Sequence, residues 1–311
     1  MEVILSAVLL LIGLVMLCFG GNWLVSGGID IAKKFRISNL VIGMTIVAFG
    51  TSSPELAASI AAAGDHSAII LGNIVGSNIA NVGMVIGVAA ILVPLAVHKS
   101  VLRKEIPIML GVSALLVLLS IDGELSQYDG ILLLIGLGIF AVYTFRSALK
   151  QREKSKDDTN PSKNNVYLKS IGLIGIGIIV LYIGAILTVD NAVVIAYEFG
   201  LSETIIGLTV IAIGTSLPEL ITSIIAIRKG HSDIGIGNII GSNIYNILMI
   251  MGVGASLGGV LITADIYVDY AIMIIFSLSL LIGLKTQIIN RTVGVILAAG
   301  YGLYLITTFL K

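Results

Sequence analysis

Two glutamates stand inside long apolar stretches of the chain, each behind nearly the same lead-in. Glu55 closes the run Gly-Thr-Ser-Ser-Pro-Glu at residues 50–55, and Glu219 closes Gly-Thr-Ser-Leu-Pro-Glu at residues 214–219. A carboxylate within an apolar membrane helix is costly and marks an ion or substrate pathway. Because the two runs match, they predict one binding site that arose by duplication.

Hydroxyl groups accompany both glutamates at helical spacing. A threonine lies four residues and a serine three residues before each glutamate, so their side chains flank the same helix face. The proline before each glutamate removes a helical hydrogen bond and frees a carbonyl oxygen, which is tolerated at membrane depth where it lines a cavity. The four hydroxyl residues are Thr51, Ser52, Thr215 and Ser216.

A second pair of motifs follows the glutamates. Gly-Asn-Ile-Val-Gly-Ser-Asn-Ile-Ala-Asn occupies residues 72–81, and Gly-Asn-Ile-Ile-Gly-Ser-Asn-Ile-Tyr-Asn occupies residues 237–246. In each motif a serine and the last asparagine lie four residues apart and share a helix face. Asn73 and Asn238 stand beside glycines, and we interpret them equally as structural caps or as ion contacts. The face-sharing pairs are Ser77 with Asn81 and Ser242 with Asn246.

The ligand types in these motifs predict a site for a hard cation. Carboxylate, hydroxyl, amide and carbonyl groups all offer oxygen, which suits Ca²⁺ or Na⁺ better than Zn²⁺ or copper. Two ionised glutamates carry a charge that one Ca²⁺ cancels. Without Ca²⁺ they repel each other in a medium of low dielectric constant and need other cations or protons. Such a site favours exchange over leaving empty, which is the physical basis of antiport.

The composition is that of a membrane protein. The 311 residues are 57% hydrophobic and 12% charged, with a mean hydropathy of +1.08, whereas soluble domains are about 25% charged. A membrane-spanning helix needs roughly 20 apolar residues, and short alternating segments typical of a barrel are absent from the sequence. The predicted fold class is therefore an all-α polytopic membrane protein. Its ten expected helices cover residues 3–32, 38–63, 68–96, 105–121, 128–147, 168–197, 203–227, 234–261, 267–284 and 292–310.

An internal duplication predicts how these ten helices are organised. Positions about 164 residues apart match across both motif pairs, so each half holds five helices. Because five is odd, the second half enters the membrane from the opposite side, as an inverted repeat. The predicted domains are a first repeat at 1–149 with motifs at 43–56 and 72–83, a cytoplasmic linker at 150–166, and a second repeat at 167–311 with motifs at 207–220 and 237–248.

The charges of the loops predict the same topology. Of the 18 Lys and Arg residues, 17 fall in loops that ten alternating helices place on one side, and only Lys311 falls on the other. Short basic loops stay in the cytoplasm. We therefore expect a multi-pass protein of the cell (plasma or inner) membrane with both termini outside. The expected partners are the lipid bilayer and the ions, with no nucleic acid and no obligatory protein partner.

The quoted motifs resemble the paired repeats of the sodium/calcium exchanger family, within the cation/calcium antiporter superfamily. The resemblance covers the whole chain in the ten-helix form found in prokaryotes. It implies a core of broken helices 2, 3, 7 and 8 around the ions at the middle of the membrane, with helices 1 and 6 as a gating pair. It also implies an antiporter that exchanges Na⁺ for Ca²⁺ by alternating access and is electrogenic, without a cofactor.

The resemblance assigns roles to individual residues. At the position of Asn246, relatives that cotransport K⁺ and some prokaryotic exchangers carry aspartate, whereas exchangers without K⁺ dependence tend to carry asparagine. Asn246 therefore resembles the K⁺-independent branch. Proton-coupled relatives usually carry Gly-Asn before the glutamate, unlike this chain. The carried-over ligands are Glu55 and Glu219 for Ca²⁺ and Na⁺; Thr51, Ser52, Thr215, Ser216, Ser77 and Ser242 with the carbonyls of Ala48 and Ala212 for Na⁺; and the symmetric pair Asn81 and Asn246.

Three rival functions remain open from the sequence. Ca²⁺/H⁺ exchange on the same scaffold would proceed without Na⁺. A cation channel would conduct without a counter-ion, but channels usually form their pore from symmetric subunits. An intramembrane hydrolase is disfavoured, because no serine–histidine, cysteine–histidine or metal-ligand set lies at membrane depth in the sequence. We therefore expect a transporter rather than an enzyme.

Overall fold

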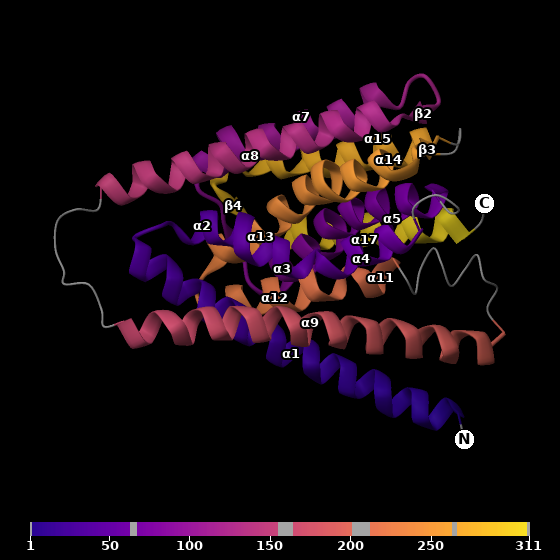
Figure 1. Ribbon diagram of the computed structural model, residues 1–311, viewed down its shortest axis with the longest axis horizontal. Helices are drawn as coiled ribbons and strands as arrows, with labels where there is room; N and C mark the ends of the chain where they lie inside the picture. The colour runs from indigo at the N-terminus through magenta and orange to yellow at the C-terminus, as the bar shows by residue number, and fades with distance from the viewer. Residues whose placement is uncertain (1, 63–66, 155–163, 201–211, 263–265, 310–311) are drawn as a thin grey trace. The chain divides into compact units, whose positions relative to one another are not determined.

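The computed structural model describes residues 2–62, 67–154, 164–200, 212–262 and 266–309, and helices make up most of them (Figure 1). The predicted all-α class is confirmed. The first half contains α1 (Glu2–Phe35), α2 (Asn39–Ile42), η1 (Gly43–Val47), α3 (Ala48–Thr51), α4 (Ser53–Ala62), α5 (Ser67–Ala80), η2 (Asn81–Ile86), α6 (Gly87–Leu92), η3 (Val101–Glu105), α7 (Ile106–Leu119) and α8 (Gln127–Lys154). The second half contains α9 (Asn164–Glu198), α11 (Ala212–Thr215), α12 (Leu217–Arg228), α13 (Ser232–Tyr245), η5 (Asn246–Met251), α14 (Gly252–Gly258), α15 (Ile266–Ser279), η6 (Leu280–Ile282), α16 (Gly283–Thr286) and α17 (Arg291–Phe309).

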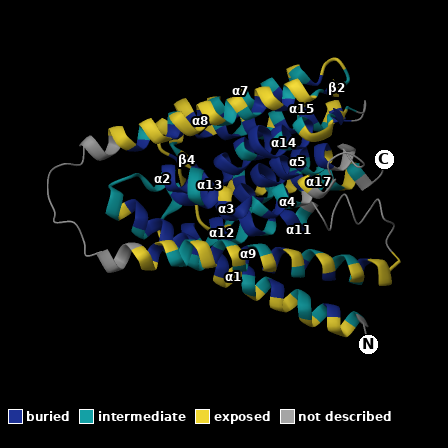
Figure 2. Cartoon of the chain, in the orientation of Figure 1, coloured by how far each residue is buried: buried dark blue, intermediate teal, exposed yellow. Residues whose placement is uncertain are grey.

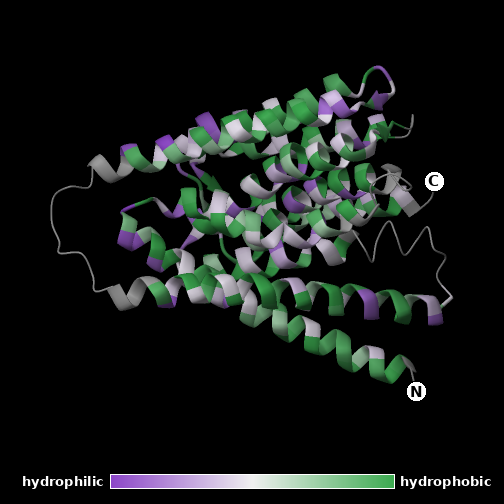
Figure 3. Cartoon of the chain, viewed as in Figure 1, coloured by the Kyte–Doolittle hydropathy of each residue, from purple (hydrophilic) through white to green (hydrophobic). Residues whose placement is uncertain are grey.

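Six helical segments among the described residues are long and apolar enough to cross a membrane. In Figure 3 the ribbons of α1 and α9 are mostly green, with white and purple stretches between. Ten crossings and their inverted orientation stay predictions, and residues 155–163 of the predicted linker lie outside the described residues. The six segments are Val3–Phe35, Ile70–Leu92, Gln127–Lys150, Leu168–Glu198, Ser232–Gly258 and Arg291–Thr308.

The chain forms two compact units, and each takes segments from both predicted repeats. Unit 1 consists of Met1–Ser53 and Phe140–Gly241, and unit 2 consists of Pro54–Ile139 and Ser242–Lys311. The compact units therefore do not follow the predicted division at the linker. Two of the changes from one unit to the other fall inside the two motif pairs, after Ser53 and after Gly241.

In unit 1, helices α1 and α9 run side by side (Figure 1). Glycines on both helices bring the two backbones close together. A Cβ atom at Gly20 would lie 2.8 Å from the amide nitrogen of Leu181, and one at Gly177 would lie 2.8 Å from that of Leu24. Small residues of this kind allow close packing of membrane helices. The outward faces of α1 and α9 are apolar and exposed, which suits contact with lipid (Figure 2).

In the described residues, both glutamate-containing segments are interrupted at the serine three residues before the glutamate. Ser52 ends α3 with φ −84° and ψ 4°, and Ser216 precedes α12 with φ −87° and ψ −1°. The proline two residues after each serine cannot donate a hydrogen bond to the preceding turn, which explains why both helices break at the same place. The interruptions predicted in helices 2 and 7 are therefore present.

The expected breaks in helices 3 and 8 are absent from the described residues. Helix α5 continues through η2 into α6, and α13 continues through η5 into α14. Here η2 and η5 are π-helical turns, and they begin at Asn81 and Asn246. Such turns keep a helix continuous while re-aiming side chains, and they occur frequently at functional sites.

Two short antiparallel ladders tie loops together in unit 2. Strand β1 (Leu95–Ala96) pairs with β4 (Ile288–Ile289), and β2 (Glu124–Leu125) pairs with β3 (Val260–Leu261). Shifting β1 by 165 residues gives β3, and shifting β2 by 164 residues gives β4. The two ladders thus exchange partners between the halves, which is the contact pattern that a two-fold axis produces.

Candidate functional site

The predicted site residues lie in the interior of the units. Helix α13, which carries one of the asparagine motifs, is largely buried in Figure 2. Ala212 begins α11, and its side chain lies outside the described part of the structure. Each of the other eleven is at most 7% exposed: Ala48, Thr51, Ser52, Glu55, Ser77, Asn81, Thr215, Ser216, Glu219, Ser242 and Asn246.

In unit 1, Glu219 is the centre of a buried polar cluster. Its side chain is fully buried, and the Ser52 hydroxyl donates a hydrogen bond of 3.1 Å to its Oε1 atom. Ser52 lies at the break between α3 and α4, so its backbone departs from regular helical geometry at the residue that donates this bond. This bond joins a serine and a glutamate that are 167 residues apart in the chain. Glu55 belongs to unit 2, and its contact with Glu219 stays a prediction.

Asn238 links the elements around this cluster. The Thr51 hydroxyl donates to Asn238 Oδ1 at 3.1 Å, and Asn238 Nδ2 donates to Ser223 Oγ at 3.0 Å and to the Glu219 carbonyl at 3.5 Å. The interpretation of Asn238 as a cap beside a glycine turn is wrong, because it lies in the middle of α13. The Thr51 hydroxyl also lies 3.3 Å from the Ala48 carbonyl oxygen of its own helix, so it can donate to either acceptor.

Two fully buried hydroxyls in unit 1 have no hydrogen-bond partner among the described residues. They are Ser216 Oγ and Thr222 Oγ1. A buried polar atom without a partner costs about 1–3 kcal/mol, and a bound cation removes that cost for an oxygen. Thr222 was not among the predicted ligands. Its spacing of three residues after Glu219 places it on the glutamate's face, and this signal in the sequence could have found it.

Unit 2 holds a second buried polar cluster, made of asparagines. Asn81 Nδ2 donates to Asn243 Oδ1 at 3.0 Å, and Asn246 Nδ2 donates to Asn78 Oδ1 at 3.1 Å. The amide oxygens of Asn81 and Asn246 have no hydrogen-bond partner among the described residues, and neither does Ser77 Oγ. Asn78 and Asn243 were not predicted as functional residues, although both belong to the second motif pair.

The two clusters can bind hard cations. They offer carboxylate, hydroxyl and amide oxygens, which are ligands for Ca²⁺ and Na⁺. No group of three or more His, Cys, Asp or Glu side chains that could hold a metal ion occurs in the described residues. The few charges and many neutral oxygens suit an ion that is bound and released rather than one held permanently.

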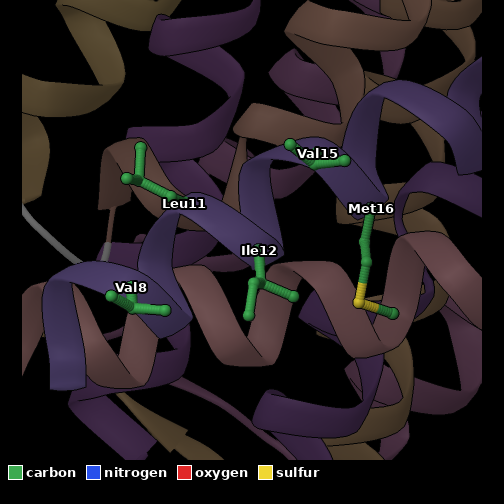
Figure 4. Close-up of a pocket in the computed structure, with 5 residues that line it drawn as sticks. All are labelled: Val8, Leu11, Ile12, Val15 and Met16. Atoms are coloured by element: carbon green, nitrogen blue, oxygen red, sulfur yellow. The ribbon is translucent and has the colours of Figure 1, made fainter.

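A hollow on the surface of α1 is lined by apolar side chains, unlike the two polar clusters. Figure 4 shows its lining, which consists of apolar side chains from one face of a single helix. The hollow therefore provides no oxygen ligand and suits contact with lipid. Its lining residues are Val8, Leu11, Ile12, Val15 and Met16.

The loop between α12 and α13 contains a histidine in a positively charged setting. Partial burial lowers the pKa of His231 below its usual 6.5, and nearby Lys33 and Lys229 lower it further, while Asp233 raises it. Its Nδ1 atom lies 3.1 Å from the amide nitrogen of Asn39, so the neutral ring accepts a hydrogen bond there. Protonation would remove that acceptor and add a third positive charge.

The stability of the protein should consequently fall in mild acid. Because the pKa of His231 is lower in the folded than in the unfolded protein, its contribution is complete above about pH 6.5 and is lost as the pH falls through the lowered folded pKa. We expect the Tm in detergent to fall from pH 7 to pH 5, and His231→Gln to reduce this slope. His98→Gln, in another loop, is the control. Equal slopes for wild type and His231→Gln would contradict the assignment.

Known proteins that resemble this chain include sodium/calcium exchangers. The family model for sodium/calcium exchanger proteins matches residues 5–146 and 169–310. The chain is 37% identical to the inner membrane protein YrbG of Escherichia coli K12, with 97% of this chain and 96% of that protein covered. It is 34% identical to the sodium/calcium exchanger MaX1 of Methanosarcina acetivorans, with 97% of each covered. A solved structure of the sodium-calcium exchanger NCX_Mj matches with a TM-score of 0.86 and 35% identity, covering 98% of this chain and 99% of that one.

The apolar helices and the similarity to known exchangers place this chain among membrane transporters. The chain belongs to the sodium/calcium exchanger family. The resemblance stated from the motifs is thereby confirmed, and Na⁺ and Ca²⁺ are substrates of the family rather than cofactors. The predicted roles of individual residues remain proposals.

Proposed function

We propose that the protein is a secondary antiporter that exchanges Na⁺ for Ca²⁺ by alternating access. The observation that carries this proposal is the fully buried Glu219 beside hydroxyl oxygens, two of which have no hydrogen-bond partner among the described residues. A buried carboxylate surrounded by neutral oxygens needs a cation, and ligands of this kind select Ca²⁺ or Na⁺. Membership of the exchanger family supports the same assignment.

The charge balance of the ligands supports electrogenic exchange without K⁺. Together, Glu55 and Glu219 neutralise one Ca²⁺ or two Na⁺. Hydroxyl and amide oxygens in both clusters supply neutral ligands for Na⁺ beyond those two, and exchange then moves net charge across the membrane. Asn81 and Asn246 add no further carboxylate, so there is no extra negative charge to demand K⁺ as a companion ion.

The ladders of unit 2 support the proposed topology, with both termini outside a cell or inner membrane. The β1–β4 ladder joins loops that carry basic residues such as Lys99 and Arg291, whereas acidic Asp122 and Glu124 lie at the β2–β3 ladder. Loops that pair with each other must lie on the same side of the membrane. The basic pair then belongs in the cytoplasm by the positive-inside rule.

Ion flux into proteoliposomes tests the proposal. Vesicles loaded with Na⁺ should take up Ca²⁺ when the outside is free of Na⁺, and a membrane potential should change the rate. Absence of Na⁺-dependent uptake would overturn the proposal. Uptake driven by a pH gradient without Na⁺ would instead establish Ca²⁺/H⁺ exchange, and Ca²⁺ flux without any counter-ion gradient would establish a channel.

Replacing Asn246 by aspartate should change the cation dependence of exchange. The substitution adds a negative charge to a side chain that is 1% exposed, and a further buried carboxylate beside Glu55 and Glu219 in the proposed site requires another cation or a proton. We expect Ca²⁺ uptake by Asn246→Asp to become sensitive to K⁺ or to pH between 5 and 8. The matched control is Asn290→Asp, which adds the same charge at an exposed position. Unchanged K⁺ and pH dependence would defeat the assignment of Asn246.

A further inference from the structure

The four asparagines of unit 2 form two equivalent hydrogen-bonded pairs. Asn81 and Asn246 occupy matching places in the two motifs, and so do Asn78 and Asn243. Asn81 donates to Asn243, and Asn246 donates to Asn78, at 3.0 and 3.1 Å. All four side chains are at most 1% exposed. Because each pair joins the two halves of the chain in the same way, the arrangement is a property of the repeat rather than of one helix.

Two methionine sulfurs determine how the side-chain amides of Asn78 and Asn243 are oriented, that is, where the oxygen and the NH₂ group of each one lie. Asn243 Nδ2 donates to Met109 Sδ at 3.5 Å, and Asn78 Nδ2 donates to Met273 Sδ at 3.7 Å. A thioether can accept a hydrogen bond but cannot donate one. The NH₂ groups of these two asparagines must therefore face the sulfurs, and the Asn78 amide also donates to the Asn243 carbonyl at 3.4 Å.

The orientation of the Asn78 and Asn243 amides determines that of the Asn246 and Asn81 amides, which donate to them. With its NH₂ group at Met109, Asn243 presents its oxygen, and only the NH₂ group of Asn81 can bond to it. The oxygen of Asn81 is then directed elsewhere, and Asn246 is oriented in the same way by Asn78. Within the described part of the chain, neither of these two oxygens has a hydrogen-bond partner. An amide oxygen attracts a cation, whereas an amide NH₂ group in its place would repel one.

We propose that Asn78 and Asn243, each held by a methionine sulfur, are positioning residues that make Asn81 and Asn246 present oxygen rather than NH₂ to the transported ion. This inference rests on the proposed function, because it assumes that a cation occupies the site. It assigns a positioning role to Asn78 and Asn243, which are not among the predicted ligands.

The decisive experiment compares Asn243→Leu in two backgrounds. We expect Asn243→Leu to raise the half-saturating Ca²⁺ concentration for Na⁺-driven uptake by about tenfold, since Asn81 then loses the acceptor that orients it. In the Asn81→Asp background the same change should have less than about a threefold effect, because a carboxylate presents oxygen in either orientation. An equal loss in both backgrounds would show a purely structural role and overturn the inference, as would no loss in the wild-type background.

Two further variants and a second measurement complete the test. Met109→Leu removes only the sulfur acceptor, keeps the packing volume, and should raise the half-saturating concentration by about threefold. Ser113→Ala on the same helix is the control, because the Ser113 hydroxyl donates to the Met109 carbonyl of its own helix and not to the Met109 sulfur. The rise in Tm with Ca²⁺ should follow the same order of affinities in purified protein. Failure of wild-type uptake alone would overturn the proposed function, whereas a wild-type Tm that Ca²⁺ does not raise would overturn the inference.

Discussion

Glu219→Gln should lower Na⁺-driven Ca²⁺ uptake more than about 100-fold while the protein remains folded. The carboxylate is fully buried and accepts the Ser52 hydrogen bond. Removing one partner of a buried charge pair costs about 3–5 kcal/mol, and each 1.4 kcal/mol corresponds to about a factor of ten. Gln keeps the shape of the side chain and can still accept from Ser52. The measurement is initial Ca²⁺ uptake in proteoliposomes matched for protein content.

The control is Glu105→Gln, which replaces another buried carboxylate outside both clusters. It should retain uptake within about twofold of wild type, because no ion-binding role is assigned to Glu105. If Glu219→Gln transported Ca²⁺ at the wild-type rate, the carboxylate would not be a ligand, and the proposed mechanism would fail at its central residue. A loss of folded protein in gel filtration would instead require the same measurement on Glu219→Asp.

Gly237→Ala should strongly reduce the yield and Tm of folded protein. A Cβ atom at this position would lie 2.7 Å from the Leu40 carbonyl oxygen, 3.1 Å from the Met44 nitrogen and 3.2 Å from the Gly43 Cα. All three are backbone atoms that no side-chain rotation can move. Overpacking of this kind costs about 1–3 kcal/mol and occasionally more. It would also push α13 away from η1, and Asn238 follows Gly237 directly.

The repeat supplies a matched control in Gly72→Ala. Gly72 is the counterpart of Gly237 in the first motif, and a Cβ atom there meets no described atom within 4 Å. Because alanine favours helix over glycine by about 1 kcal/mol, this variant should be as stable as wild type or slightly more so. Thermal unfolding of both variants in detergent checks the prediction. Equal Tm values for them would contradict the close packing of α13 on η1.

The proposed ligands could be selected from the sequence because they repeat, whereas the residues proposed to orient them could not. Glu55 and Glu219 occupy the same place in two matching motifs, and this repetition identifies both as candidate ligands without any knowledge of contacts. The role of Asn238 depends on Thr51, which is 187 residues away, and no local pattern indicates such a contact. Asn78 and Asn243 were overlooked for the same reason.

Two features of the backbone also escaped prediction, for a physical reason. The π-helical turns at Asn81 and Asn246 have no established signal in residue type, since the hydrophobic pattern of a continuous helix barely changes across one turn. The four strands contain two residues each, too few for any alternation of polar and apolar positions to show. Prolines, in contrast, act through their own covalent structure, and the loss of helical hydrogen bonds before Glu55 and Glu219 was accordingly predicted from the sequence.

The division into two units has a consequence for how the protein is made. Neither unit is complete when the first repeat has left the ribosome, because unit 1 needs the chain up to Gly241 and unit 2 needs its C-terminal segment. The helices of the first half are therefore synthesised before the segments of the second half that complete their units. Before the duplication, a single repeat would have held only parts of both units. Such an ancestor would have needed a second copy of itself to complete them.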